Sequence, residues 1–304
     1  MKYKTEEVFR IGKDNTCINI NWEMVSHCQY DCSYCYYKPF QSDTNYTTLG
    51  KIVLKKLQQI EEEFIINLIG GEPTLHPDFI EILNKLIEID KLKEIRIVTN
   101  LVKPLNFWVK ITPSPKVKIT ASYHPEYPNK SFIEKLESLA KVYRTDTAFL
   151  ITNEIDHLNK SKEVFKNLFA LSQASTHTLN PIRLHKKEDS VTRYIAYQEE
   201  INEFIIHCEQ KIKELKNKET VSIETISGEK ILTKPEFLNN ELHALKGWRC
   251  AINAFIIHYD AMVSYACKGI KKHILTCDFK TNAINCPFNY CECDDYWEFK
   301  KDKV

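Results

Sequence analysis

Short apolar runs alternate with amphipathic segments along roughly the first 190 residues of the chain. Residues 64–69, FIINLI, form a continuous apolar run of the kind that buried parallel strands show. Further strands are expected at residues 16–21, 94–100, 117–124, 147–154 and 177–185. Helical spacing is expected at residues 49–63, 77–89, 131–143 and 160–171, and Pro77 suits a first helical position. Five or six βα units predict an α/β fold with a parallel sheet and right-handed crossovers, shorter than a full eight-unit barrel of about 250 residues.

The pattern changes near residue 190. Residues 191–218 carry a charged helical pattern, and residues 221–232 predict a hairpin that turns near Ser227 and Gly228. Alternation over residues 251–266 predicts a second hairpin, with its turn near Asp260 and Ala261. We therefore expect an α/β part at residues 1–190, a helical connection at 191–218, and a small Cys-rich α+β module at 219–304.

Composition narrows the possible classes of protein. A net charge of +1 gives no bulk attraction to nucleic acid or to a membrane. The N-terminus lacks the apolar core of a signal peptide, and no apolar run approaches the ~20 residues of a membrane span. A cytoplasmic location is expected, where thiols stay reduced, so the 11 cysteines indicate metal binding rather than disulfides.

Three cysteines, Cys28, Cys32 and Cys35, lie within eight residues of one loop. Zinc sites usually draw four ligands from two separated pairs, whereas a short loop can hold three corners of an iron–sulfur cube. Three thiolates on four irons leave one iron open, as catalytic metal sites require. His27 is a weaker candidate ligand, because neighbouring side chains usually point apart.

This spacing resembles the signature of radical S-adenosylmethionine enzymes. Tyr34 stands where that family has an aromatic residue, and GGEPTLHP, residues 70–77, follows a predicted strand as the family's Gly-Gly-Glu-Pro motif does. The resemblance covers residues from about 16 to 190. It implies a partial (β/α)6 barrel, a [4Fe–4S] cluster on Cys28, Cys32 and Cys35, and S-adenosylmethionine as cofactor.

The resemblance also implies roles for single residues. Gly70 and Gly71 would let the backbone approach the cofactor's amino group, and Glu72 would accept a hydrogen bond from it. Ser122 would face the ribose, although a turn serine is an equal alternative, and an ordinary strand-to-helix turn is the alternative for the glycines. Tyr34 and Asn100 complete the expected cofactor site. Other polar residues at strand ends are scaffold groups or substrate contacts: His124, Asn153, Asn180, Arg183 and His185.

A second group of cysteines follows near the C-terminus. The 251–266 hairpin is expected to bring Cys250 and Cys267 together. The expected ligands are Cys250, Cys267, Cys286 and Cys291, with Cys293 close behind and Cys277 as a sixth candidate. The arrangement resembles the twitch and SPASM extensions of the same family and implies one further iron–sulfur cluster, expected to be of the [4Fe–4S] type; a zinc ribbon is the alternative. Cys17 and Cys208 are expected to be ordinary buried cysteines.

The resemblance implies reductive cleavage of S-adenosylmethionine to a 5′-deoxyadenosyl radical, which takes a hydrogen atom from a substrate. Flavodoxin or ferredoxin would supply the electron. Only 27 residues precede Cys28, too few for a leader-binding domain, so a small-molecule substrate is expected. A lyase acting on a modified nucleobase such as queuine is the narrower hypothesis. The alternatives are a peptide- or amino-acid-modifying enzyme and a non-catalytic metal-binding protein with zinc in both sites.

Overall fold

A computed structural model describes residues 7–12, 17–35, 40, 42–188, 191–215, 220–265, 271–280, 282–291 and 300–304. Its main element is a nine-stranded sheet with the order β15-β14-β13-β2-β3-β4-β5-β6-β7. The six strands from β2 to β7 are consecutive neighbours and all run parallel. They are β2 (Ile18–Val25), β3 (Phe64–Gly70), β4 (Leu92–Thr99), β5 (Val117–Tyr123), β6 (Arg144–Ile151) and β7 (Thr178–Arg183). The expected partial (β/α)6 barrel is therefore confirmed, and its strands begin and end within a few residues of the predicted bounds.

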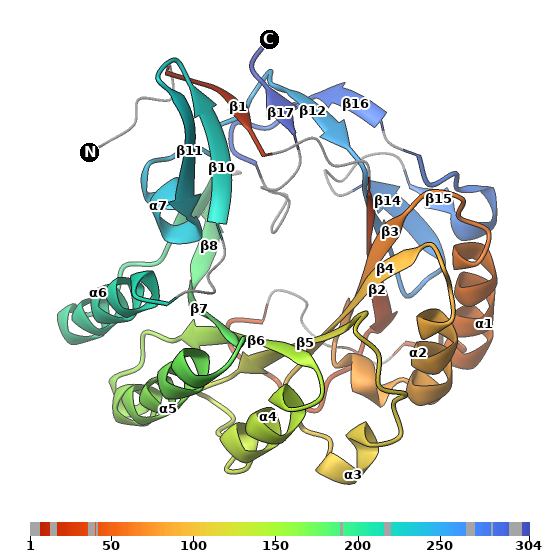
Figure 1. Cartoon of the computed structure of the whole chain (residues 1–304), viewed down its shortest axis with the longest axis horizontal. Helices are drawn as coiled ribbons and strands as arrows, with labels where there is room; N and C mark the ends of the chain where they lie inside the picture. The colour runs from red at the N-terminus through yellow and green to blue at the C-terminus, as the bar shows by residue number, and fades with distance from the viewer. Residues whose placement is uncertain are drawn as a thin grey trace.

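Helices cover the outer face of this curved sheet, as Figure 1 shows. They are α1 (Tyr46–Leu57), α2 (Phe79–Ile87), α3 (Leu105–Trp108), α4 (Phe132–Ala140) and α5 (Ile155–Ala174). The prediction that Pro77 opens a helix is wrong by two residues, because Asp78 is the N-cap of α2. Before it, η2 (Pro73–Leu75) makes one tight turn directly after β3. That turn carries the chain from the sheet edge to the helix layer.

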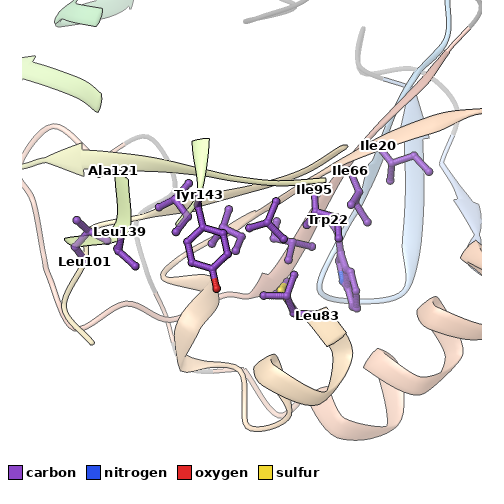
Figure 2. Packing of buried hydrophobic residues seen from close by; sticks show 14 of the residues in the cluster. Ile20, Trp22, Ile66, Leu83, Ile95, Leu101, Ala121, Leu139 and Tyr143 are labelled. Atoms are coloured by element: carbon purple, nitrogen blue, oxygen red, sulfur yellow. The ribbon is translucent and has the colours of Figure 1, made fainter. Parts of the chain in front are cut away.

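Side-chain alternation separates an apolar outer face of the sheet from a polar inner face. Ile20, Trp22 and Ile66 belong to one hydrophobic cluster with Leu83 of α2, and Trp22 and Leu83 lie on the helix side of the strands (Figure 2). On the opposite face, the amide of Asn67 donates hydrogen bonds to the side chains of two asparagines of β2, Asn19 (2.8 Å) and Asn21 (2.7 Å). The hydrophobic core therefore lies between sheet and helices, and the inner face is left to polar groups.

The segment after β7 differs from the prediction at residues 185–194, where strands form before the helix. A short ladder pairs β8 (His185–Glu188) with β9 (Val191–Tyr194), and helix α6 follows only at Glu199–Lys213. The expected helix from residue 191 is therefore wrong in its first residues, where local strand pairing replaces it. Among the described residues, no helix is both long and apolar enough to span a membrane.

A second sheet of six strands has the order β11-β10-β1-β17-β12-β16. Its members are β1 (Val8–Ile11), β10 (Thr220–Thr225), β11 (Gly228–Thr233), β12 (Arg249–Ile252), β16 (Asn282–Asn285) and β17 (Lys301–Asp302), with the short helix α7 (Lys234–Asn239) after β11. The predicted hairpin at 221–232 is confirmed, with Gly228 at φ +110° beside the turn.

The predicted hairpin at 251–266 is right at its turn and wrong at its start. Strands β13 (Ala254–Ile257) and β14 (Met262–Tyr265) pair around Asp260 and Ala261, but β12 belongs to the other sheet. The chain changes sheets at Asn253, whose amide donates to the Cys17 carbonyl at 2.6 Å. Strand β13 then adds to β2 in parallel, and β15 (Lys272–His273) follows β14. The Cys-rich segment thus shares the sheet of the barrel.

Candidate functional site

The cysteine loop leaves the C-terminal end of β2. Cys32 is buried, whereas Cys28 and Cys35 are half-buried. The Cys35 amide donates to the Cys32 carbonyl at 3.0 Å, which keeps the loop tight. Asn100, at the end of β4, donates from its side-chain amide to the Cys28 sulfur at 3.7 Å. The structure therefore brings this predicted residue to the predicted cysteine loop.

The chemistry of the loop fits an iron–sulfur cube. Burial, with a smaller contribution from neighbouring thiols of the loop, raises the pKa of Cys28 and raises that of Cys32 to about 11. Bound iron would stabilise the thiolates and so offset the cost of deprotonating these buried thiols. In the described part of the chain, no three His, Cys, Asp or Glu side chains converge on one ion. A cube binds each thiolate at a different corner, so the donor set suits a cluster better than a single zinc ion.

Gly70 and Gly71 allow the start of the cysteine loop to lie against the end of β3. A Cβ on Gly71 would lie 1.9 Å from the carbonyl oxygen of His27, and Gly70 has φ +130°. The amides of Gly71 and Glu72 donate to the carbonyls of Val25 and His27, both at 2.9 Å. The space expected for a cofactor is thus filled, on the Cβ side, by this protein's own backbone. Approach of a cofactor to the remaining backbone edge stays a prediction.

The Glu72 carboxylate links the turn after β3 to the end of β4, and the residue is only 1% exposed. Its Oε1 accepts hydrogen bonds from the Thr74 hydroxyl (2.6 Å), the Thr74 amide (3.2 Å) and the Thr99 hydroxyl (2.8 Å). Its Oε2 accepts from the Asn100 amide at 2.9 Å. Burial raises the pKa of Glu72, and these hydrogen bonds act in the opposite direction. Only Oε2 has acceptor capacity left for the amino group that the sequence predicts.

We expect Glu72→Gln to destabilise the cofactor-free protein by about 3 kcal/mol, because an amide NH2 would face buried donors that now bond a carboxylate. Urea unfolding measures this change. Glu81→Gln is the matched control, since Glu81 is exposed and forms an ion pair with Lys85 on the surface of α2. This variant should change stability by less than about 0.5 kcal/mol. Equal unfolding curves for the two variants would contradict the role of Glu72 as a brace.

The loop after β5 binds the cysteine loop through aromatic rings. His124 stacks on Tyr34, with ring planes 4° apart, and its Nδ1 lies 3.1 Å from the Tyr34 hydroxyl and 3.5 Å from the Cys32 sulfur. Burial lowers the pKa of His124 to about 4. Tyr30 stacks on Tyr127 at 4.6 Å between centroids. Tyr34 thus lies at the cysteine loop, as predicted, but it faces a histidine there.

Glu126 adds a polar clamp that sequence reasoning missed. It accepts from the Ser33 amide at 2.8 Å and from the Ser33 hydroxyl, while the Tyr127 hydroxyl accepts from the Asp31 amide at 3.2 Å. The only signal in the sequence is the cluster of aromatic and acidic residues that follows β5. It suggests a contact surface without saying which loop it meets.

Of the other predicted strand-end residues, one lies on the inner face of the sheet and two bond the scaffold. Ser122 lies on β5 opposite Ala148, on the polar inner face by alternation with buried Tyr123. Asn153, by contrast, bonds the segment before α6, accepting from the Gln198 amide at 2.8 Å. Arg183 forms an ion pair with Glu209 of α6, partly buried, at 2.7 Å. Asn153 and Arg183 are therefore tied to the scaffold. Asn180 of β7 is half-buried, and His185 begins β8.

Four of the six C-terminal candidate ligands are described, and all four are buried. Cys250 lies in β12, Cys286 directly follows β16, and Cys291 packs in the core of the second sheet. The Cys286 amide donates to the Trp248 carbonyl at 2.8 Å. With Cys250 opposite Ile284, this register puts Cys250 and Cys286 on one face. Cys267 and Cys293 lie outside the described residues.

The remaining cysteines lie elsewhere. Cys277 packs in the barrel's hydrophobic cluster, not with Cys291 in the second sheet. Cys208 of α6 is fully buried, and burial raises its pKa. Cys17 is half-buried just before β2, so its predicted burial is only partial. The idea that one hairpin joins Cys250 to Cys267 is wrong at its first strand, because Cys250 precedes the change of sheet at Asn253.

A carboxylate–imidazole–hydroxyl chain crosses from the barrel to the Cys-rich segment. The Glu23 carboxylate of β2 lies 3.0 Å from His258 Nδ1, and His258 Nε2 lies 2.8 Å from the Ser264 hydroxyl of β14. Glu23 and Ser264 are 4% and 3% exposed. No sequence signal links these residues, which are more than 230 positions apart. These hydrogen-bonded side chains hold the β13–β14 hairpin beside the end of β2 that leads into the cysteine loop.

Comparison with known proteins agrees with this architecture. Residues 22–157 match the model of the Radical SAM superfamily. GTP 3′,8-cyclase of Haemophilus influenzae (strain ATCC 51907 / DSM 11121 / KW20 / Rd) is 29% identical over 96 residues, which are 29% of this chain and 28% of that protein. GTP 3′,8-cyclase of Pasteurella multocida (strain Pm70) is 32% identical over 78 residues, 24% of this chain and 23% of that protein. The chain thus spans about a quarter of the curated relatives it matches.

Two solved structures share the fold at low sequence identity. Streptococcus suis SuiB superposes with a TM-score of 0.50 and 13% identity, covering 86% of this chain and 64% of SuiB. Histidine-tagged anSMEcpe with bound AdoMet gives a TM-score of 0.50 and 15% identity, covering 87% of this chain and 76% of that one. At these identities the likeness concerns the fold alone.

Proposed function

We propose that this chain, whose residues 22–157 match the model of the Radical SAM superfamily, is an enzyme that cleaves S-adenosylmethionine reductively. The single observation that carries the proposal is the loop of Cys28, Cys32 and Cys35 held against the Gly70–Gly71 backbone. The 5′-deoxyadenosyl radical formed in this way would take a hydrogen atom from a substrate.

The residues of the site have separate tasks in this proposal. Cys28, Cys32 and Cys35 would hold a [4Fe–4S] cluster, which supplies the electron for cleavage and an open iron for the cofactor. Glu72 and Asn100 hold the ends of β3 and β4 together, and Asn100 also orients Cys28. Ser122 on the inner face is the proposed ribose contact.

The substrate that we propose is a small polar molecule. The inner face of the sheet presents amides on β2 and β3, and the Glu23–His258 pair stands at the wall next to the cysteine loop. Such groups recognise hydrogen-bonding ligands rather than apolar ones. A lyase acting on a modified nucleobase such as queuine is the narrower form of the proposal, since a heterocycle offers both donors and acceptors to such a wall.

We also propose a second cluster, in the Cys-rich segment. Its support is the burial of Cys250, Cys286 and Cys291 together with the shared face of the first two. Cys267 and Cys293 are the proposed candidates for the remaining ligand. We propose reduced flavodoxin or ferredoxin as the electron donor and the cytoplasm as the location. The proposed division of the chain is residues 1–190, 191–218 and 219–304.

The test uses protein that is purified and reconstituted without oxygen. Incubation with S-adenosylmethionine and dithionite should form 5′-deoxyadenosine, detected by mass spectrometry. Elemental analysis should give about eight irons and eight sulfides per chain, the content of two four-iron clusters. Stoichiometric zinc with neither iron nor 5′-deoxyadenosine would favour a binding protein instead. About four irons per chain together with full cleavage would refute the second cluster but not the proposed cleavage.

A further inference from the structure

We propose that His124 donates a hydrogen bond from Nδ1 to the thiolate of Cys32 and thereby raises the reduction potential of the cluster that Cys28, Cys32 and Cys35 hold. This inference rests on the proposed function, because it assigns a tuning group to the same site. His124 is in this role a positioning residue and is not a cluster ligand.

The geometry around Cys32 is specific. His124 Nδ1 lies 3.5 Å from the Cys32 sulfur, a normal separation for a hydrogen bond to sulfur, and 3.1 Å from the Tyr34 hydroxyl. An iron-bound thiolate only accepts hydrogen bonds, so a ring nitrogen that faces it must carry the proton. The Tyr34 hydroxyl can then accept from the same N–H or donate to the sulfur itself.

The ring has little freedom to turn away from the sulfur. Tyr34 stacks on one side of His124 with planes 4° apart, and Tyr30 meets it edge-on at 5.9 Å between centroids. Tyr30 is itself stacked on Tyr127, and the Ser33–Glu126 hydrogen bond at 2.8 Å joins the same two loops. Cys32 is also the most buried of the three loop cysteines. A hydrogen bond in so dry a place is stronger than one exposed to water.

The direction of the effect follows from charge. Reduction adds one negative charge to the cluster and its thiolates, so a donor aimed at sulfur stabilises the reduced form more than the oxidised form. Removing the donor should therefore make the cluster harder to reduce. Cys32 would be the ligand most affected, because His124 faces its sulfur, whereas Cys28 accepts from the Asn100 side-chain amide.

Two substitutions separate hydrogen bonding from stacking. His124→Phe keeps an aromatic ring between the tyrosines but has no donor, whereas His124→Gln keeps an N–H donor and loses the ring. His157→Phe is the matched control, since His157 pairs with Thr152 behind β6 and touches none of the loop cysteines. Each reconstituted holoenzyme is titrated with dithionite, following the EPR signal that S-adenosylmethionine perturbs.

At a fixed potential, His124→Phe should lower the ratio of reduced to oxidised cluster about tenfold, a shift of about 59 mV for a one-electron couple. His124→Gln and His157→Phe should stay within about twofold of the wild type. An unchanged midpoint in His124→Phe, or a larger shift in His124→Gln than in His124→Phe, would overturn the inference.

A second measurement does not depend on the Phe variant loading its cluster. Pulsed EPR of wild-type protein with 15N-labelled histidine should show a weakly coupled nitrogen that His124→Gln removes. A spectrum without such a coupling, or with one that persists in His124→Gln, would also overturn the inference. Protein that binds no iron at all, by contrast, would refute the proposed function itself.

Discussion

Replacing any one of Cys28, Cys32 and Cys35 by alanine is expected to abolish formation of 5′-deoxyadenosine. Each variant would leave one corner of the cube without its thiolate, and the short loop offers no other sulfur within its eight residues to replace it. Loss should be complete within detection, measured by mass spectrometry of anaerobic reactions with S-adenosylmethionine and dithionite. The Cys28 and Cys35 variants should still unfold cooperatively, because these two side chains are only half-buried.

Cys17→Ala is the matched control for this series. Cys17 precedes the same strand, β2, but lies at its other end and is also half-buried. It should keep cleavage within about twofold of the wild type, since no role in the site is assigned to it. Full turnover in Cys32→Ala would contradict the assignment of the loop, and loss of turnover in Cys17→Ala would show that the series reports damage to the fold.

Gly71→Ala is expected to disrupt the site with the second-largest effect. The new Cβ would lie 1.9 Å from the oxygen and 2.4 Å from the carbon of the His27 carbonyl, and backbone cannot move aside as a flexible side chain can. We expect a loss of at least about 3 kcal/mol in the free energy of unfolding. Cluster loading should also fall, because His27 directly precedes Cys28 and would be pushed away from β3.

Gly247→Ala separates crowding from backbone strain. Gly247 has φ +81° and nothing within 4 Å of an added Cβ, so alanine there costs only conformational energy, about 1–2 kcal/mol. Iron content and urea unfolding of the two variants should therefore differ, with Gly247→Ala retaining its iron. A Gly71→Ala protein with wild-type iron content would show that the contact between β3 and the cysteine loop is not needed for the site.

Much of the barrel could be predicted because its strands are buried on the helix side. The apolar run at β3 and the alternation at β5 indicate their burial in the sequence itself, and the helices between them carry a clear apolar face. The cysteine loop and Gly70–Gly71 could be found for a different reason. Their chemistry requires particular residue types at fixed local spacing.

The parts that escaped prediction depend on pairing between distant segments. Apolar residues stand on both sides of Asn253, so the hydrophobic pattern does not reveal the change of sheet there. The addition of β13 to β2 joins residues more than 230 positions apart, and Glu23 and His258 meet only through it. The partners of Glu72 and His124 were likewise hidden. A buried carboxylate or an imidazole shows in the sequence that it needs a partner, but not which one.

The parallel ladder between β2 and β13 limits how the molecule can move. Ala254, Phe255, Ile256 and Ile257 pair with four residues of the strand that leads into the cysteine loop. To swing the C-terminal segment away as a hinged body, the protein would have to unzip this ladder and leave an open edge on the central sheet. Entry and exit of small molecules should therefore leave this ladder between β2 and β13 intact.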